Sequence, residues 1–446
     1  MSNNQNKLYV IGLTLVATLG GLLFGYDTAV ISGAEKSIQA FLIDSQGLSS
    51  FIHGATTSSA LIGCIIGGAI SGMLSSKFGR KRSLMLAALL FLVSALGSGY
   101  PEFLFFEKGV PSISLLMMFN LYRIIGGIGV GLASAISPVY IGEIAPADIR
   151  GRLVSINQFA IIFGMLVVYF VNWGIANGQS IEWINSVGWR YMFLSEAIPA
   201  SIFGILLFFV PETPRYLALT NRNEEALRVL TNINGSERAK EIITEIKNTL
   251  DHHSSKIFSY GKKVVIIGIL LSVFQQFVGI NVALYYAPRI FESMGAAKDA
   301  SMLQTVVMGL VNVIFTVFAI TTVDKLGRKP LLIIGSIGMA VGMFAISGLA
   351  YFNVIGISTL IFIIIYTASF MMSWGPITWV LISEIFPNKI RGRAVAIAVA
   401  FQWAANYFIS STYPAMMEYS GTMTYGFYGL MSILSAIFVW KMIPET

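Results

Sequence analysis

Long apolar stretches alternate with short polar ones from one end of the chain to the other. Each stretch has about 20 residues or more, enough to cross a hydrocarbon core of about 30 Å at a rise of about 1.5 Å per residue. The pattern predicts an all-α membrane protein with twelve transmembrane helices. The expected helices cover residues 9–38, 50–75, 83–100, 112–142, 153–174, 188–211, 264–290, 301–323, 330–351, 355–384, 393–413 and 424–443.

One long polar stretch, residues 211–256, follows the sixth apolar stretch. Within it, NEEALRVL (223–230) and AKEIITEIKNTL (239–250) carry apolar residues at helical spacing with charges between them. This spacing predicts short amphipathic surface helices, whereas an enzymatic linker domain would need a longer and more apolar segment. We therefore expect three parts: residues 1–211, a cytoplasmic helical linker over 212–262, and residues 263–446.

The two halves of the chain repeat each other. Three pairs of segments match in the same order and between the same helices, which predicts two six-helix bundles with a ligand site between them near the middle of the membrane. The pairs are KFGRKRSLM (77–85) with KLGRKPLLI (325–333), IGEIAPADIRGR (141–152) with ISEIFPNKIRGR (382–393), and VPETPR (210–215) with IPET (443–446).

Composition agrees with a membrane protein. Of 446 residues, 55% are hydrophobic and 11% are charged, and the mean hydropathy is +0.74. The short segment MSNNQNK before the first helix has one lysine and no cleavage site after it, so we expect a retained helix rather than a signal peptide.

The net charge of +7 reflects topology rather than nucleic-acid binding. The basic residues gather in the loops on one side of the predicted helices, at 77–82, 150–152, 324–329 and 388–393, and in the linker. The positive-inside rule therefore places the linker and both termini in the cytoplasm. The loops on the other side hold only Lys36, Lys108, Arg289 and Lys298.

Cysteine and histidine usage gives no sign of a metal or cofactor site. The single cysteine, Cys64, lies in an apolar stretch, which excludes an internal disulfide. The histidines, His53, His252 and His253, have no spacing that links them to other metal ligands. We expect no metal, no cofactor and no enzymatic nucleophile.

The repeated loop motifs predict ion pairs at the cytoplasmic side. Gly79 and Gly327 allow tight turns, while Arg80 and Arg328 present guanidinium groups that bind carboxylates or helix ends. We hypothesise that such pairs hold the two halves together in one conformational state, the alternative being that they only enforce topology. The candidate gating residues are Arg80, Glu143, Arg150, Arg328, Glu384 and Arg391.

Three ionisable residues stand out inside the predicted helices: Asp27, Arg123 and Glu196. Each lies about ten residues from the end of its helix, or roughly 15 Å, so all three share one depth near the membrane centre. A buried arginine stays charged and needs acceptors, and a carboxyl that leaves it takes up a proton. The trio fits a proton-coupling site, with a static link between helices as the alternative.

Uncharged polar residues form a second group inside the helices. Amides supply paired donors and acceptors and indole rings suit the C–H faces of a sugar ring, so a neutral polyol is the favoured ligand; hydrogen bonding between helices is the alternative for any single amide. Gly279 predicts local unwinding that brings Gln276 and Asn281 together, and GPITW (375–379) predicts a kink beside Trp379. The group comprises Gln158, Gln275, Gln276, Asn281, Tyr285, Asn312, Trp379, Gln402 and Trp403.

With these motifs in view, the chain resembles the sugar porter family of the major facilitator superfamily from end to end. The segments that carry the resemblance are GRKR, DKLGRK, EIAPADIRGR, PETPR, QQFVGIN and SEIFPNKIRGR. Within the family, GLTLVATLGGLLFGYDTAVISG (12–33) and YRIIGGIGVGLAS (122–134) are most similar to bacterial proton-coupled D-xylose symporters.

The resemblance implies the major facilitator fold in a bacterial inner membrane, a monomer, and import of D-xylose with protons by alternating access. It implies that Asp27 is the proton-coupling carboxylate, Arg123 its partner and Glu196 a supporting acid. The implied sugar-site residues are Gln158, Gln275, Gln276, Asn281, Trp379, Gln402 and Trp403, with Phe24 and Tyr285 at the edge.

Two differences from the xylose symporters keep alternatives open. Met165 stands where they carry a second glutamine, so a glucose or hexose transporter, as symporter or uniporter, remains the alternative. The family also implies a polar tail after the terminal IPET, which suggests a trimmed chain. A sugar sensor of this family would need a long cytoplasmic extension.

Overall fold

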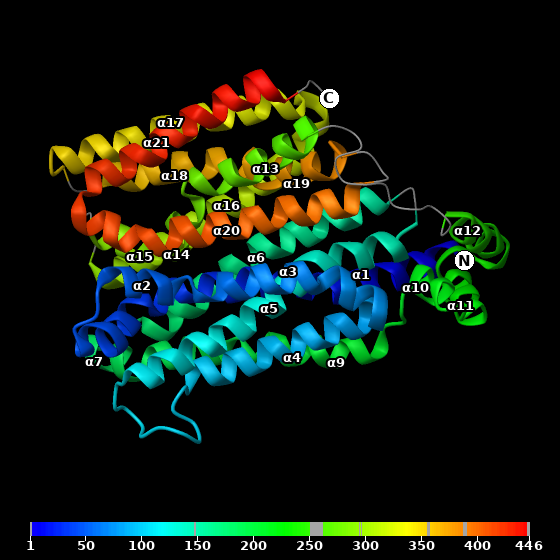
Figure 1. Ribbon diagram of the computed structural model, residues 1–446, viewed down its shortest axis with the longest axis horizontal. Helices are drawn as coiled ribbons and strands as arrows, with labels where there is room; N and C mark the ends of the chain where they lie inside the picture. Colours follow the sequence, from blue (N-terminus) through cyan, green and yellow to red (C-terminus); the bar gives the residue numbers. More distant parts are fainter. Residues whose placement is uncertain are drawn as a thin grey trace.

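The helices of this chain run side by side as long rods, with a small helical group beyond one end (Figure 1). The computed structural model describes residues 2–146, 149–249, 262–293, 295, 297–354, 357–386 and 390–443. Within these ranges, 12 helical segments are long and apolar enough to cross a membrane, which confirms the predicted fold class.

The first half forms six of these segments, several of them built from more than one helix. The second predicted span is interrupted at Ser58, and the sixth begins at Ile181, seven residues before the predicted start. The elements are α1 (Ser2–Ile38), η1 (Gln39–Ile43), η2 (Asp44–Gln46), α2 (Ser50–Thr57), α3 (Ser59–Phe78), α4 (Arg80–Gly99), α5 (Ile113–Ile144), α6 (Arg150–Ala176), α7 (Ile181–Trp183), η3 (Ile184–Gly188), α8 (Trp189–Ser195) and α9 (Ala197–Phe209).

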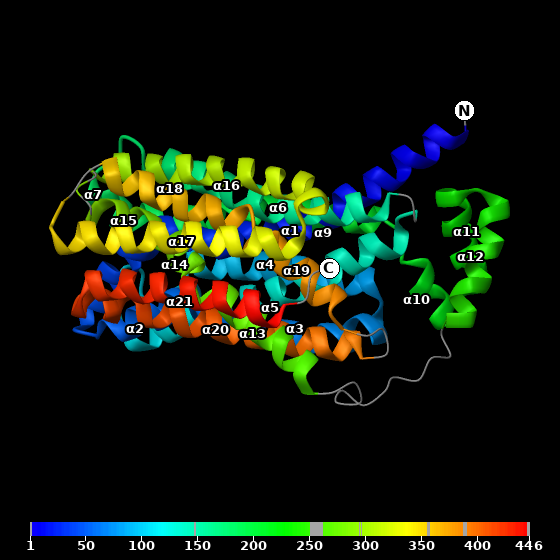
Figure 2. The same cartoon turned by 90° about the horizontal axis from the view of Figure 1, so that it is seen from above.

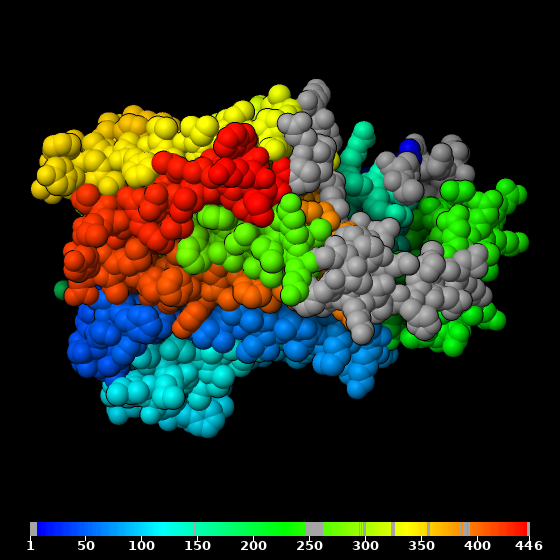
Figure 3. Space-filling model, turned by 45° about the horizontal axis from the view of Figure 1, so that its top comes forward, coloured from blue at the N-terminus to red at the C-terminus, as the bar shows by residue number. Residues whose placement is uncertain are grey.

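The second half forms the other six segments. In Figures 1 and 3 its yellow-to-red helices lie against the blue-to-cyan helices of the first half. The halves meet where α2 and α3 contact α20, and where α6 contacts α16. The elements are α13 (Lys262–Phe277), α14 (Ile280–Tyr285), α15 (Ala287–Ser293), α16 (Lys298–Leu326), α17 (Arg328–Tyr351), α18 (Ile357–Met371), α19 (Trp374–Glu384), α20 (Arg391–Tyr419) and α21 (Gly421–Met442).

The linker folds as helices at one end of the molecule (Figure 2). Both predicted surface helices are present, as α11 (Asn223–Asn234) and α12 (Ser236–Thr249). A third, α10 (Pro214–Leu219), precedes them because Pro214 suits a first turn and the Thr213 hydroxyl accepts from the Tyr216 amide. The apolar face of α11 buries Ala226, Val229, Leu230 and Ile233.

Two breaks in the second half shape the space between the halves. Gly279 takes φ +91° between α13 and α14, as its position predicted, and Tyr366 donates to the freed Val278 carbonyl at 2.7 Å. The α18 helix ends at Met371, ahead of Gly375 and Pro376. The predicted kink therefore lies upstream of Trp379, because a proline disrupts bonding to the carbonyl four residues before it.

Glycines bring the helices of the first half into backbone contact. A Cβ atom added to Gly127 of α5 would lie 1.8 Å from the Ala60 carbonyl oxygen of α3, and one on Gly63 would lie 2.0 Å from the Ile124 oxygen. Between α1 and α6, the corresponding distances are 1.8 Å from Gly25 to the Ile161 oxygen and 2.1 Å from Gly164 to the Leu22 oxygen. These pairs of helices are packed as closely as backbones allow.

We predict that Gly127→Ala lowers the apparent melting temperature in detergent, because the methyl group must push α5 from α3. Overpacking of this kind costs about 1–3 kcal/mol, more than the helix propensity that alanine adds. Gly142→Ala is the matched control, since it lies on α5 with nothing within 4 Å of its Cβ position. Equal melting temperatures for both variants would contradict the packing argument.

Candidate functional site

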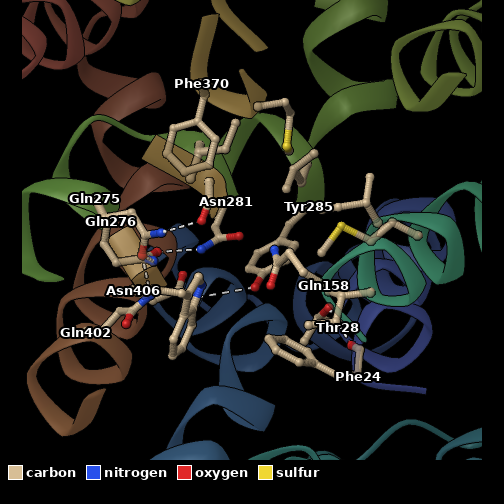
Figure 4. A pocket seen from close by; sticks show the side chains of 18 of the residues that line it. Phe24, Thr28, Gln158, Gln275, Gln276, Asn281, Tyr285, Phe370, Gln402 and Asn406 are labelled. Atoms are coloured by element: carbon tan, nitrogen blue, oxygen red, sulfur yellow. Dashed lines mark hydrogen bonds between the residues drawn. The ribbon is translucent and has the colours of Figure 1, made fainter. Parts of the chain in front are cut away.

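A pocket lies between the two halves near the middle of the long helices (Figure 4). Its empty volume is about 620 Å³. The breaks at Gly279 and Ser373 turn side chains of α14 and α19 into it. It is lined by Phe24, Thr28, Gln158, Ile161, Ile162, Met165, Gln275, Gln276, Ile280, Asn281, Leu284, Tyr285, Phe370, Met371, Gly375, Trp379, Gln402, Trp403 and Asn406.

The second half supplies a connected set of amides to one wall of this pocket. Gln275 donates to the Trp374 carbonyl at 3.0 Å, and Gln276 donates to the Gln275 side-chain oxygen at 3.2 Å. Asn281 donates to Gln276, and Gln402 donates to Gln275. The unwound turn at Gly279 allows the Asn281 contact, since five residues of regular helix would separate these two amides.

Two polar atoms in this wall have no hydrogen-bond partner among the described residues: Gln402 Oε1 and Trp403 Nε1. Both residues are 5% exposed. A buried polar atom without a partner costs about 1–3 kcal/mol, which a ligand with hydroxyl groups would recover. The wall therefore suits a neutral ligand that both donates and accepts.

The first half supplies a more apolar wall. Phe24 of α1 packs against Trp403 of α20, with ring centroids 5.6 Å apart. Met165 and Gln158 of α6 line the same side, and Met165 is buried. The pocket thus joins a ring-stacking surface to an amide network, as a sugar ring with apolar faces and polar edges requires.

A buried charge pair lies directly behind α1. Arg123 Nη1 donates to Asp27 Oδ1 at 2.7 Å, and Nη2 donates to the Asp27 backbone oxygen at 2.9 Å. Arg123 is 2% exposed and Asp27 is fully buried. Asp27 faces α5 while its neighbour Thr28 faces the pocket, so one turn of α1 connects the charge pair to the pocket wall.

Glu196 lies beside the pair rather than on the guanidinium. Its carboxyl group lies next to that of Asp27. Neither Glu196 oxygen has a hydrogen-bond partner among the described residues. The sequence argument expected Glu196 to accept from Arg123. Two buried carboxyls beside one cation leave one negative charge unbalanced unless a proton or a further cation neutralises it.

The nine residues expected at the sugar site all line the pocket, whereas Asn312, although buried, does not. Sequence reasoning missed Thr28 and Asn406. Thr28 follows Phe24 by four residues and so shares its helix face, a signal that was available. Asn406 donates to the Tyr285 hydroxyl at 3.3 Å, and it follows Gln402 at the same spacing.

Among the described residues, the ion pair of the repeated loop motifs, Arg80 with Glu143, lies within the first half. Arg80 donates to Glu143 at 2.8 Å and to the Ser75 carbonyl at 3.2 Å, joining α4 to α5 and α3. Arg150 donates to the Ala145 carbonyl at 3.3 Å, and Arg328 begins α17. In this structure the Arg80 pair lies within the first half, and the side chains of Glu384 and Arg391 lie outside the described residues. The hypothesis that such pairs hold the halves together in one state and break in the other stays a prediction.

Glu212 of the PET motif is a further residue that the sequence argument did not use. Its carboxylate accepts from the backbone amides of Arg80, Lys81 and Thr213 at 2.8–3.2 Å, and so caps α4. Burial raises the pKa of Glu212 even though these amides oppose the rise. The motif therefore anchors the linker to the start of α4.

The prediction of only three ionisable residues inside the spans is also incomplete. Glu35 of α1 is 1% exposed, and Arg190 of α8 is 4% exposed and paired with Glu102 at 2.7 Å. Both lie near the ends of the predicted helices 9–38 and 188–211, and the sequence argument did not consider them. Burial raises and Arg190 lowers the pKa of Glu102, with a net fall.

No group of three or more histidine, cysteine or acidic side chains in the described ranges is arranged to hold a metal ion.

Comparison with known proteins identifies the family. The model of the sugar (and other) transporter family matches residues 13–446. This chain belongs to the sugar transporter family.

Individual relatives cover this transporter almost completely. It is 51% identical to the D-xylose-proton symporter of Escherichia coli (strain K12), over 100% of this chain and 95% of the relative. It is 43% identical to the arabinose-proton symporter of Bacillus subtilis (strain 168), over 100% and 94%. The transporter is therefore a homologue of two proton symporters. Its family is one of transporters and not of enzymes.

A solved structure shows the same fold. The inward-open conformation of the xylose transporter XylE from E. coli matches with a TM-score of 0.90 at 52% identity, over 98% of this chain and 97% of that chain. The transporter is therefore a multi-pass membrane protein with the major facilitator architecture.

We predict that Arg123→Met destabilises the transporter more than the double variant Arg123→Met with Asp27→Asn. Removing the cation alone leaves a buried carboxylate unpaired, at a cost of about 3–5 kcal/mol, and the second change removes that charge. Melting temperatures in detergent, measured by size-exclusion chromatography after heating, test this ordering. Additive losses would show that the two side chains do not interact.

Proposed function

We propose that this transporter imports a monosaccharide, D-xylose in the first place, together with protons by alternating access. The observation that carries the proposal is the position of the Asp27–Arg123 pair. It lies one residue along α1 from the pocket wall, so sugar binding and protonation act on the same helix turn. The relatives at 51% and 43% identity, named as pentose-proton symporters, support the assignment.

The proposed coupling follows from the charges. When Asp27 is ionised and paired with Arg123, the two charges cancel. When Asp27 is protonated, Arg123 loses its carboxylate partner, and α1 is free to shift against α5. The neighbouring Glu196 then serves as the alternative acceptor or proton holder. Sugar bound between Phe24 and the amide wall draws the two halves together, and loss of the proton on the other side resets the pair.

The proposed architecture has residues 1–211 and 263–446 as the two moving bundles and 212–262 as their linker. We propose that both termini and the linker helices face the cytoplasm, that the membrane is the bacterial inner membrane, and that the transporter works as a monomer. Its ligands are the sugar, protons and lipid, with no role for nucleic acid. The basic loops support this orientation.

Asp27→Asn should abolish uphill sugar accumulation while sugar exchange persists, because the amide cannot gain or lose a proton but still accepts from Arg123. Proteoliposomes with an inward proton gradient report accumulation, and counterflow of labelled sugar reports exchange. Thr14→Ala, a buried position on α1 outside the pocket, is the control. Uphill uptake by Asp27→Asn would refute the role of Asp27.

Glucose transport is the second candidate, favoured by the apolar side chain of Met165 in the pocket wall. A hexose carries one more hydroxymethyl group than a pentose, and an unbranched thioether can make room for it. Competition of a sugar panel against labelled xylose ranks the two candidates. Simultaneous measurement of proton uptake separates symport from uniport.

Met165→Gln should then shift selectivity toward xylose, since an added amide hydrogen-bonds a ring hydroxyl at the site where apolar packing favours the larger sugar. A gain or loss of one such bond corresponds to about a 5–10-fold change in relative affinity. The ratio of inhibition constants for xylose and glucose measures the effect. Met165→Leu is the control that keeps the apolar wall, and an unchanged ratio in Met165→Gln would exclude Met165 from selectivity.

A further inference from the structure

A network of charged side chains joins the two halves at the end opposite the linker helices (Figure 1), where α15 contacts α1. Arg289 of α15 donates Nε and Nη2 to the two oxygens of Glu35 on α1, at 2.9 and 2.8 Å. Lys36 pairs with Glu292 close by. Among the described residues, both ion pairs that join the two halves lie at this end. These ion pairs hold the halves together here.

His53 adds a second partner to the same carboxylate. Its Nε2 atom lies 3.1 Å from Glu35 Oε2, and its side chain is 1% exposed. This distance is within ion-pair range, and neither ring nitrogen has a hydrogen-bond partner among the described residues. His53 lies on α2 and Glu35 on α1, so this contact stays within the first half, whereas the Arg289 contact crosses to the second half.

The two contacts respond oppositely to a proton on His53. With a neutral imidazole, Glu35 and Arg289 form a balanced pair across the interface. A charged imidazole satisfies Glu35 from its own half and places a second cation beside Arg289, with one carboxylate to balance both. The closed arrangement then carries an uncompensated positive charge in a buried site, which separation of the halves would hydrate.

We infer that His53 is a second proton-binding site of this transporter, and that its protonation opens the end of the molecule opposite the linker by releasing Glu35 from Arg289. Imidazole is the side chain that ordinarily titrates between pH 5 and 8. Because the open arrangement relieves the uncompensated positive charge, acid shifts the population toward it. The inference rests on the alternating-access transport proposed above.

The other charged and titratable groups around His53 do not replace it in this role. Tyr286 faces the ring edge-on with centroids 6.3 Å apart, and Tyr413 of α20 packs behind Tyr286; both phenols stay neutral in this pH range. Burial lowers and Glu35 raises the pKa of Arg289, with a net rise, so it stays charged. Glu418 of α20 accepts from Ser50 of α2 at the exposed rim.

Distances between spin labels at the two halves test the inference. Ile181→Cys on α7 and Ile357→Cys on α18 are at exposed positions at this end, whereas the native Cys64 is fully buried. The measurement is made on the purified full chain without sugar, in an Asp27→Asn background, at pH 8 and pH 5.5. That background removes the proposed coupling carboxylate, so a remaining pH response belongs to another group.

In the parent, we expect the long-distance population to grow on acidification, by up to about tenfold. His53→Gln, and His53→Leu as a second variant, should stay closed at both pH values. Glu35→Gln should be open at both. The control Glu418→Gln changes a carboxyl at the same interface and should retain the parent response.

A pH response that survives in both His53 variants would overturn the inference, as would a Glu35→Gln protein that stays closed. The readout needs neither transport nor a gradient, so it is independent of whether Asp27 couples protons to sugar. Conversely, loss of uphill uptake in Asp27→Asn tests the proposed function without reference to His53. The two proposals can therefore fail separately.

Discussion

The pairing of Arg123 with Asp27 is the interaction on which the rest of this structure depends. A guanidinium that is 2% exposed in a membrane-spanning helix has to be neutralised by a neighbour. Asp27 does this with both its side chain and its backbone oxygen, which fixes the rotation of α1 against α5. With that rotation set, Phe24 and Thr28 face the pocket and the α1 backbone meets α6. The charge pair thereby determines where the apolar wall of the pocket stands.

The two halves divide the chemistry between them. The first half carries the buried Asp27–Arg123 pair, and the second half carries most of the amides of the pocket, with Gln275, Gln276 and Asn281 beside the break at Gly279. A charge pair tolerates little relative movement, because its energy falls steeply once the partners separate in a medium of low dielectric. Interrupted helices bend at their breaks with less cost, since their freed carbonyls are already satisfied by groups such as Tyr366. This difference fits a rigid first half that binds the proton and a more adaptable second half that binds the sugar.

Much of this arrangement could be predicted from residues alone. Span length and hydropathy located the helices, and the depth of Asp27 and Arg123 along their spans placed them at one level, where they meet. The break at Gly279 could be predicted because glycine adopts a positive φ more readily than other residues. The partners of Arg80 and Glu196 could not be predicted, because a side chain chooses among several acceptors by tertiary geometry. Glu35 and His53 were missed for a related reason: they lie near helix ends, where a charge is usually hydrated, and here α15 packs against α1 and α20 packs against α2.

The glycine contacts between α3 and α5 and between α1 and α6 have a mechanical consequence. Helices whose backbones already touch cannot move closer, and they cannot move apart without opening a void that lipid or water fills poorly. The first half is therefore stiff in the direction across its helices, and a displacement at one end is transmitted along about 30 Å of membrane with little loss. Stiffness of this kind lets events at one surface of the bilayer be felt at the other, and it leaves these few positions with no tolerance for a larger side chain.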